Sequence, residues 1–227
     1  MEIPDQKKIN DKEIIKLTSD YVRTHLELEA SGHDWWHVYR VWQLAKFIAK
    51  QESADFFVVE LAALLHDIAD WKFYGGDEDI GAKTAKKWMS NFSLPESTID
   101  HICQIIKDIS FKGAGVADKM KSKEGKIVQD ADRLDAIGAV GIARCFAYGG
   151  NKNNVMHDPR FKPKMHSSAK EYFFSESTSI SHFYEKLLLL KGRINTQTGR
   201  KIAEKRHKFM KKFLDNFFQE WEAKDVE

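Results

Sequence analysis

The residues of this chain best suited to chemistry are a histidine and an aspartate that stand side by side in an apolar segment. His66 and Asp67 lie within the run Val-Val-Glu-Leu-Ala-Ala-Leu-Leu-His-Asp-Ile-Ala. If this run packs into the interior, Asp67 leaves water, and an unpaired buried carboxylate carries a large free-energy cost. The carboxyl group must then be protonated, ion-paired or bound to a cation. The neighbouring imidazole is a second donor for a cation, which favours the last of these states.

Two further residues complete a set of metal donors. His37 occurs in His-Asp-Trp-Trp-His-Val-Tyr-Arg-Val, and Asp132 occurs in Asp-Ala-Asp-Arg-Leu-Asp. Taken singly, His37 could be a hydrogen-bonded core histidine, and Asp132 could form an ion pair with Arg133 or Arg144. Two imidazoles and two carboxylates near apolar stripes on three predicted helices instead favour a metal site. Helical bundles build such sites from side chains on facing helices.

The donor types narrow the choice of metal. Two nitrogens and two oxygens leave a six-coordinate ion with open positions for water and substrate. Mn, Fe, Co and Ni suit this mixture, Mg is compatible with it, and Zn is less favoured. Such an ion lowers the pKa of bound water and neutralises charge on a phosphoryl oxygen. The sequence therefore predicts one divalent metal ion in the chain.

Helices must position these donors, because helical periodicity dominates the chain and no alternating strand pattern occurs. The predicted helices cover 11–28, 34–51, 54–69, 79–92, 95–109, 126–147, 180–190 and 198–221. Asp34 is the expected N-cap of the helix that carries His37. Residues 74–77 and 110–125 are expected to be loops, and 149–168 to be irregular. The predicted class is all-α.

Length and composition indicate a single globular domain over residues 1–227. The chain is 42% hydrophobic and 31% charged, with a formal net charge of +2, which is typical of a folded protein. The near balance of charge argues against a protein that chiefly coats nucleic acid or an acidic membrane. No apolar run reaches the roughly 20 residues that span a bilayer, and the N-terminus has no apolar signal core. The two cysteines lack zinc-type spacing and look like reduced thiols, so we expect a cytoplasmic protein.

The ordered set His37, His66, Asp67 and Asp132 resembles the HD-domain metal-dependent phosphohydrolases. Three phrases are more specific: Gly-His-Asp-Trp-Trp-His-Val-Tyr-Arg-Val, Leu-His-Asp-Ile-Ala-Asp-Trp-Lys-Phe and Gln-Asp-Ala-Asp-Arg-Leu-Asp-Ala-Ile-Gly-Ala. They resemble a stand-alone bacterial subgroup within which nucleotide pyrophosphohydrolase activity is known. The resemblance implies that these four residues bind one divalent metal.

The resemblance extends over nearly the whole chain and implies its architecture. An HD-domain helical bundle is expected over about residues 20–147, followed by the irregular segment. The C-terminal helices, 180–221, are expected to form an extension that closes over the cleft. In that extension His182, Lys186 and Arg193 could bind substrate phosphates; the alternative is an amphipathic helix with solvated charges.

Other residues receive roles around the ligands. Asp70, one helical turn after Asp67, matches the position of an acidic residue beside the attacking water; it could instead be a solvated residue at a helix end. Lys72 could contact a phosphate or be an ordinary surface lysine. Four more residues could support the site from outside the ligand set: His33, Asp34, His101 and Asp130. Of these, His101 could supply a second metal site, but no additional histidine pair accompanies it, so a single metal ion is favoured.

These observations predict a metal-dependent phosphohydrolase of EC class 3.1 or 3.6. It would hydrolyse a phosphoester or pyrophosphate bond of a nucleotide or a similar small phosphorylated compound. One alternative is a non-catalytic, metal-containing nucleotide sensor or partner-binding helical module. Another is nucleic-acid binding through the basic last helix, against which the near-neutral charge counts. A homodimer, the identity of the substrate and the physiological metal are left open.

Overall fold

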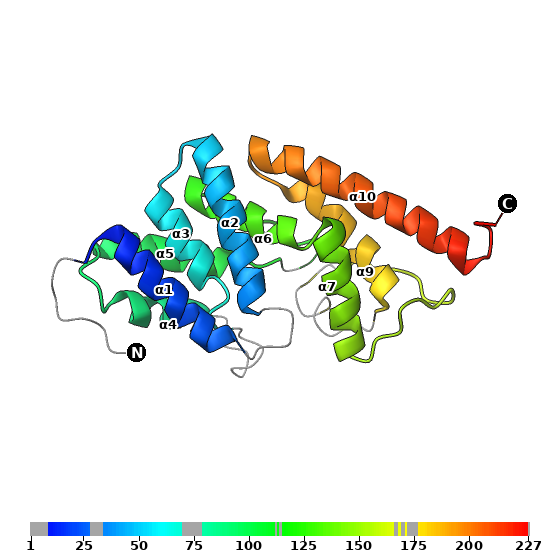
Figure 1. Cartoon of the computed structure of the whole chain (residues 1–227), viewed down its shortest axis with the longest axis horizontal. Coiled ribbons are helices and arrows are strands. Elements are labelled where there is room, and N and C mark those ends of the chain that lie inside the picture. Colours follow the sequence, from blue (N-terminus) through cyan, green and yellow to red (C-terminus); the bar gives the residue numbers. More distant parts are fainter. Residues whose placement is uncertain are drawn as a thin grey trace. The chain divides into compact units, whose positions relative to one another are not determined.

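All regular elements of the structure, a computed structural model, are helical. The structure describes residues 9–27, 34–69, 79–111, 113, 115–165, 168, 171 and 177–226, and none of these residues lies in a strand (Figure 1). The predicted all-α class is confirmed. The loop expected at 74–77 lies outside the described residues.

Contacts divide the chain into two compact units, and the boundary falls inside one helix. The first unit comprises Met1–Phe111 and Asp118–Ala131, and the second comprises Lys112–Ala117 and Asp132–Glu227. The boundary therefore runs through α6, Lys123–Asp135. The prediction of a single domain over the whole chain stays a prediction.

The N-terminal unit is organised around α3. Its helices are α1 (Asp11–Leu26), α2 (Trp35–Glu52), α3 (Phe56–Leu65), α4 (Ile80–Met89), α5 (Glu96–Asp108) and the start of α6. Helix α3 contacts α1, α2 and α5, and α4 packs on α5 (Figure 1). Because α3 is apolar on every side, it buries Leu61 and its neighbours up to Leu65 completely. A helix of this kind forms the centre of a core.

Side-chain caps fix where the first helices begin. The side chain of Asn10 accepts from the backbone N–H of Glu13 at the start of α1. The Asp34 carboxylate accepts from the N–H of His37 at 2.8 Å, so Asp34 is the N-cap of α2, as predicted. Each cap satisfies one of the backbone donors that have no partner within the helix.

Helix α3 ends earlier than its apolar periodicity predicts. The expected helix over 54–69 runs only from Phe56 to Leu65, with His66 as its C-cap. Asp67 then lies in the turn that follows. His66 itself keeps helical backbone angles, with φ −60° and ψ −31°. The His-Asp pair is thus carried at the end of a helix and not along its side.

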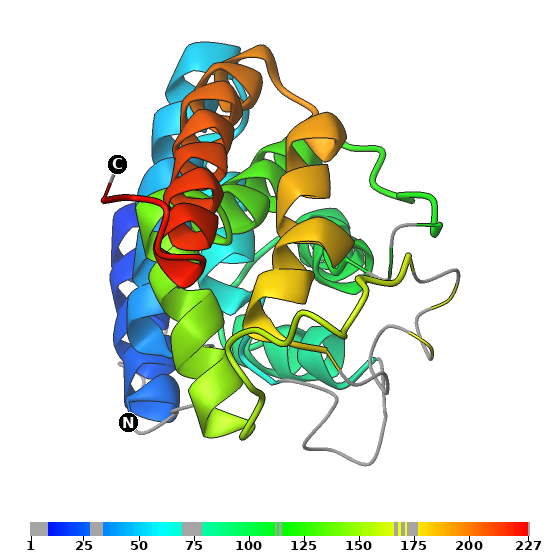
Figure 2. The same cartoon turned by 90° about the vertical axis from the view of Figure 1, so that its right-hand side faces the viewer.

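The C-terminal unit contains α7 (Gly138–Asn151), α9 (Ser179–Glu185), the 3-10 helix η2 (Leu187–Arg193) and α10 (Gln197–Trp221). Helix α10 packs on α7 and η2, and α9 packs on α7 and η2. Figure 2 shows α9 continuing into η2 before the chain returns along α10. The helix predicted over 198–221 is therefore present, whereas the one predicted over 180–190 is an α-helix followed by a 3-10 helix.

A glycine divides the helix that was predicted over 126–147. Gly138 has a φ of +81°, a left-handed conformation that favours glycine over residues with a Cβ. Helix α6 consequently ends at Asp135 and α7 begins at Gly138. Helix α7 also continues to Asn151, so the irregular segment expected at 149–168 starts later than predicted. Helix α6 starts at Lys123, inside the expected loop at 110–125.

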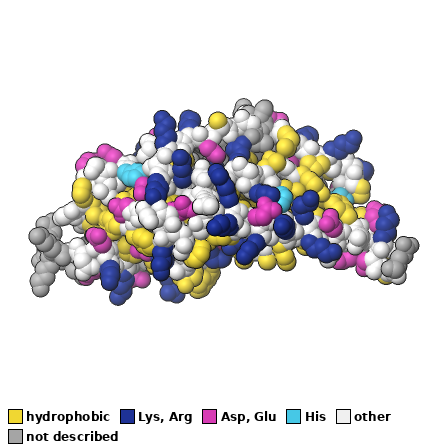
Figure 3. All heavy atoms as spheres, turned by 90° about the horizontal axis from the view of Figure 1, so that it is seen from above, with side chains coloured by type: hydrophobic (Ala, Val, Ile, Leu, Met, Phe, Trp, Pro, Cys, Tyr) yellow, Lys and Arg dark blue, Asp and Glu magenta, His cyan; other side chains and the backbone are white. Residues whose placement is uncertain are grey.

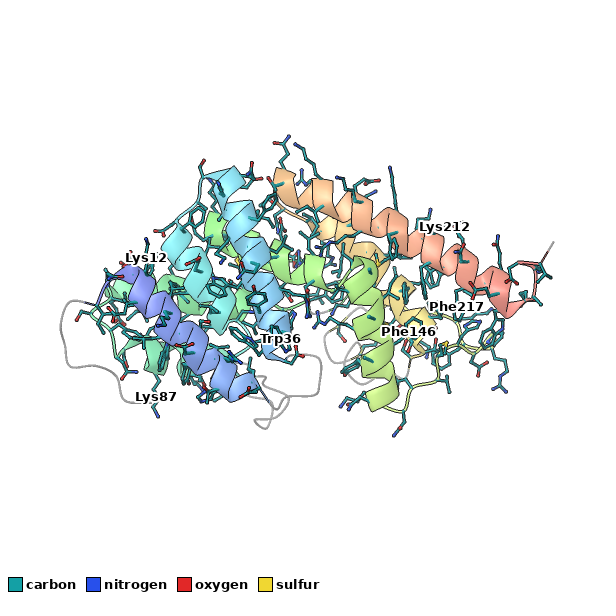
Figure 4. The ribbon with its side chains drawn as sticks, in the orientation of Figure 1. Lys12, Trp36, Lys87, Phe146, Lys212 and Phe217 are labelled. Carbon is teal, nitrogen blue, oxygen red and sulfur yellow. The ribbon has the colours of Figure 1, made fainter. Side chains whose placement is uncertain are left out.

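Aromatic rings hold α10 in the C-terminal unit. The rings of Phe183 and Phe213 stack with centroids 5.8 Å apart, and Phe146 lies edge-on to Phe213 at 5.9 Å. Farther along α10, His157 meets the ring of Trp221 at 4.8 Å. Figure 4 labels Phe146 on α7 and Phe217 on α10, two members of this row of rings. These rings therefore pack α10 within the C-terminal unit, whereas Phe209 on the same helix is 53% exposed.

The outer side of α10 is basic but not uniformly so. Its exposed cationic side chains include Lys201, Lys205, Lys208, Lys211 and Lys212. Glu204 lies among them, 2.6 Å from Lys191 and 3.9 Å from Lys208. In Figure 3, dark-blue, magenta and yellow side chains are mixed on the right-hand part of the visible face, and no part of it is uniformly dark blue. Among the described residues, none of the helices combines the length and apolar character needed to cross a membrane.

Candidate metal centre

His37 enters the interior from the first turn of α2. Its side chain is fully buried, beside Val38 and Val41 on the apolar face of the helix. The cap by Asp34 holds the backbone of this turn in place. The orientation expected from the helical spacing is therefore observed.

His66, at the C-cap of α3, is held in one tautomer. Its Nδ1 lies 2.8 Å from the carbonyl oxygen of Ala63. A carbonyl can only accept, so Nδ1 carries the hydrogen and Nε2 of the neutral ring keeps its lone pair. Metal-binding histidines are commonly oriented through such a hydrogen bond from the other ring nitrogen.

The two imidazoles meet through their Nε2 atoms. These atoms lie 3.3 Å apart, in rings inclined at 68°. Two lone pairs at this distance repel each other unless a proton or a cation lies between them. Two ligands at right angles on one ion, with bonds of about 2.1 Å, are about 3 Å apart. The spacing of His37 and His66 therefore fits two ligands of one metal ion.

Carboxylates lie close to both rings. Asp67 Oδ2 is 3.3 Å from His37 Nε2 and 3.5 Å from His66 Nε2, and its side chain is 20% exposed. The sequence predicted that Asp67 leaves water, but the turn after α3 keeps it partly accessible. Asp132 is half-buried on α6. One of its carboxylate oxygens and one ring nitrogen from each of His37 and His66 all lie within 4.8 Å of one another. The four predicted donors are thus neighbours, and their types and spacing fit a divalent ion.

The two arginines proposed as alternative partners of Asp132 bind other acceptors. Arg144 Nη1 donates to Asp135 Oδ2 at 2.7 Å. Arg133 Nη1 donates to the carbonyl oxygen of Arg193 at 2.6 Å. The acceptors of these two guanidinium nitrogens are thus Asp135 and the backbone of Arg193.

The residues expected around the ligands have different positions. Asp130 is fully buried on α6. His101 Nε2 lies 4.0 Å from Glu124 Oε2, and Glu124 is two helical turns before Asp132, about 12 Å along α6. A role of His101 as a ligand of a second metal ion stays a prediction. His33, Asp70 and Lys72 lie outside the described residues.

The three predicted phosphate-binding residues all belong to the α9–η2 segment. His182 is half-buried on α9, Lys186 is the C-cap of that helix, and Arg193 ends η2. Arg193 Nη1 donates to the carbonyl of Val116 at 2.9 Å. Because its own carbonyl accepts from Arg133, the end of η2 is bound to the residue that follows Asp132.

A buried carboxylate in this segment was missed in the sequence. Glu185 is 2% exposed, and it accepts from the backbone N–H of Lys164 at 3.0 Å and from Ser177 Oγ at 2.6 Å. It therefore fastens two points that are far apart along the chain to α9. The only sequence signal is a glutamate two residues after the buried Phe183 and two before the buried Leu187, which is too weak to single it out.

Comparison with known proteins identifies the family of this geometry. The HD domain family model matches residues 35–137, which contain all four donors. The chain is 40% identical over 195 residues to the uncharacterized protein YpgQ of Bacillus subtilis (strain 168), an alignment that covers 86% of this chain and 87% of YpgQ.

Solved structures agree with this match. A Lactobacillus plantarum protein has a TM-score of 0.82 at 34% identity, covering 92% of this chain and 97% of that one. An HD-superfamily hydrolase of Bacillus thuringiensis has a TM-score of 0.74 at 41% identity, covering 94% and 100%. The crystal structure of B. subtilis YpgQ in complex with ADP has a TM-score of 0.74 at 33% sequence identity, covering 92% and 96%. The chain belongs to the HD domain family, among the HD-superfamily hydrolases and beside stand-alone bacterial proteins such as YpgQ.

Proposed function

We propose that this protein is a metal-dependent phosphohydrolase acting on a nucleotide or a similar small phosphorylated compound. The observation that carries the proposal is the 3.3 Å approach of His37 Nε2 and His66 Nε2. Asp132 and Asp67 supply oxygen donors beside them. One divalent ion, Mn, Fe, Co, Ni or Mg, suits this donor set better than Zn.

The chain's own residues prepare this site for a cation. The carbonyl of Ala63 fixes the His66 tautomer, so that ring presents a lone pair without a proton having to leave. The carboxylates of Asp67 and Asp132 bring negative charge that offsets the charge of the ion. A divalent ion held there lowers the pKa of water and neutralises charge on a phosphoryl oxygen. Asp70 is proposed to orient or deprotonate the attacking water.

A nucleotide is the proposed substrate class because the related YpgQ binds ADP in its crystal structure. Lys72 and the α9–η2 residues His182, Lys186 and Arg193 are proposed to hold substrate phosphates. A guanidinium has five N–H donors, so Arg193 can donate to the Val116 carbonyl and to a phosphate oxygen at the same time. Hydrolysis of a phosphoester or a pyrophosphate bond is compatible with these roles, which correspond to EC 3.1 or 3.6.

The test is the release of phosphate or pyrophosphate from a panel of nucleoside mono-, di- and triphosphates with Mn²⁺. We expect turnover by the wild-type protein and its loss in His66→Ala. Loss of a residue that only hydrogen-bonds to a metal ligand typically weakens metal binding about 10- to 100-fold. Because His66 is a proposed ligand itself, the Kd of His66→Ala for Mn²⁺ should rise by more than that. His25→Ala is the matched control, because His25 is exposed on α1 and its ring bonds within its own helix to the carbonyl oxygen of Tyr21.

Two results would contradict the proposal. If protein loaded in turn with Mn²⁺, Fe²⁺, Co²⁺, Ni²⁺ and Mg²⁺ hydrolyses no compound of the panel, the enzymatic function is wrong. If a nucleotide then raises the melting temperature without product, the alternative of a non-catalytic nucleotide sensor takes its place.

A further inference from the structure

An arginine from α10 binds the end of the helix that carries Asp132. Arg206 Nη1 donates to the carbonyl oxygen of Leu134, in the last turn of α6. The last four carbonyls of a helix have no partner within it and form the negative end of its dipole. The backbone N–H of Ile137 also donates to Leu134 O at 3.2 Å. Arg206 thus adds a cationic donor to a carbonyl two residues after Asp132.

The chain is shaped to admit this arginine. A Cβ added at Gly138 would lie 2.9 Å from Cγ and 3.1 Å from Cβ of Arg206. The positive φ of Gly138 already makes a larger residue unfavourable there. The break between α6 and α7 therefore does two things: it turns the chain and it leaves room for the Arg206 stem.

The surroundings make the Arg206 contact hard to replace by water. Burial lowers the pKa of the Arg206 guanidinium, and the nearby Asp135 carboxylate acts in the opposite direction. Asp135 is itself 3% exposed and pairs with Arg144 of α7 at 2.7 Å. A cation so placed is costly unless it is paired and hydrogen-bonded. Arg206 itself is half-buried, so its guanidinium is partly shielded from water and its hydrogen bond to Leu134 O offsets part of the cost of burial.

We infer that Arg206 is a positioning residue for Asp132. By holding the Leu134 carbonyl it keeps the last turn of α6 helical and sets the direction in which the Asp132 carboxylate is presented. Helix geometry transmits this constraint, because residues in one turn share a ladder of backbone hydrogen bonds. Asp132 O itself accepts from the N–H of Ala136 at 3.3 Å. This inference rests on the proposed function only in requiring that Asp132 is a metal ligand.

The test is Mn²⁺ affinity, measured by titration calorimetry or by the electron paramagnetic resonance signal of free Mn²⁺. Arg206→Met keeps the stem and removes the donor. We expect its Kd for Mn²⁺ to rise about tenfold or more, as for other outer-sphere partners of metal ligands. Arg200→Met is the matched control: Arg200 also lies on α10 and donates to a backbone carbonyl, that of Ile194, at 3.0 Å. Its Kd should stay within about twofold of the wild-type value, below that outer-sphere range.

A conservative variant separates positioning from general loss of structure. Arg206→Lys retains a cation that can donate to one carbonyl, so it should recover most of the affinity lost in Arg206→Met. If Arg206→Met does not fold, Arg206→Lys is compared with Gly138→Ala, which displaces the Arg206 stem from the other side. In that case Gly138→Ala should bind Mn²⁺ about tenfold more weakly than Arg206→Lys.

The outcomes distinguish this inference from the proposed function. Wild-type affinity in folded Arg206→Met, with loss of binding in His66→Ala, overturns the role of Arg206 and leaves the metal site in place. Equal weakening in Arg200→Met overturns it too, because the effect would then be general to α10. If the wild-type protein binds no Mn²⁺ at all, the proposed metal site and the role of Arg206 both fail.

Discussion

The acidic residues of this protein illustrate how differently burial acts on single side chains. Asp67 stays partly exposed beside two imidazoles, whereas Asp130 and Asp135 are buried on α6. Glu60, on α3, is half-buried, and burial raises its pKa above the usual 4.5 although Lys46 acts in the opposite direction. Glu60 is not one of the candidate metal ligands, so its charge can be removed without changing a ligand.

At the residue scale we predict that Glu60→Gln stabilises the protein near neutral pH. The raised pKa means that the folded state binds a proton more tightly than the unfolded state, so the ionised carboxylate costs stability as pH rises through the folded pKa. Glutamine resembles the protonated form. The gain at pH 7 should be at most about 1 kcal/mol, because the side chain is partly screened by solvent and the attraction of Lys46 is lost.

Thermal melting at pH 7 and pH 4 tests this prediction. The melting temperature of Glu60→Gln should exceed that of the wild type at pH 7, and the difference should disappear at pH 4. Asp20→Asn, at an exposed position on α1, serves as the control and should change little at either pH. A gain of equal size at both values would show that ionisation of Glu60 is not its source.

Helix ends decide the geometry of the candidate metal centre at the element scale. His37 lies in the first turn of α2, His66 caps the C-terminus of α3, and Asp132 lies in the last turn of α6. Helix ends carry unsatisfied backbone groups, so their caps are part of the site. Asp34 and Ala63 supply the hydrogen bonds at the two histidines.

We predict that Asp34→Ala weakens both the fold and the binding of Mn²⁺. Loss of an N-cap costs about 1 kcal/mol, and fraying of the first turn of α2 would release His37. Asn10→Ala removes an equivalent cap from α1 and should cost similar stability without changing the affinity for Mn²⁺. Melting curves and metal titrations of both variants provide the comparison. Equal metal affinity in the two variants would refute a role of the α2 cap in the site.

At the scale of the whole molecule, α6 belongs to both compact units. The boundary between Ala131 and Asp132 lies inside the continuous helix α6. Unfolding of either unit would therefore break backbone hydrogen bonds of the part of α6 that belongs to the other unit. Helix formation is cooperative. The contact boundary is therefore compatible with one folding unit, as the sequence predicts.

We expect a single calorimetric transition on heating. Leu61→Ala in the N-terminal unit should lower stability by about 2–5 kcal/mol, and Phe183→Ala in the C-terminal unit by about 3–5 kcal/mol, because both side chains are fully buried. Each variant should shift the same transition as a whole. Two resolved transitions, with each variant moving only one of them, would show that the units unfold independently.

The sequence by itself determined the all-α class, the cap at Asp34 and the four donors of the candidate metal centre. These features depend on local patterns: helical periodicity, a capping residue before an apolar run, and donor types beside apolar stripes. The resemblance carried by the phrases around His37, His66 and Asp132 agrees with the HD domain match over residues 35–137.

Only the tertiary structure decided where α3 ends, where α6 and α7 separate, and which residues surround the break between them. The apolar periodicity continues past Leu65, but the His66 ring donates a hydrogen bond to the carbonyl oxygen of Ala63. The local sequence pattern does not predict this bond. In the sequence Gly138 is an ordinary small residue, and only the structure gives its left-handed φ and the Arg206 stem beside it. The end of α3 involves a specific side-chain hydrogen bond to the backbone, and the contact of Gly138 with Arg206 joins residues far apart in the chain. A hydrophobic pattern contains information about neither.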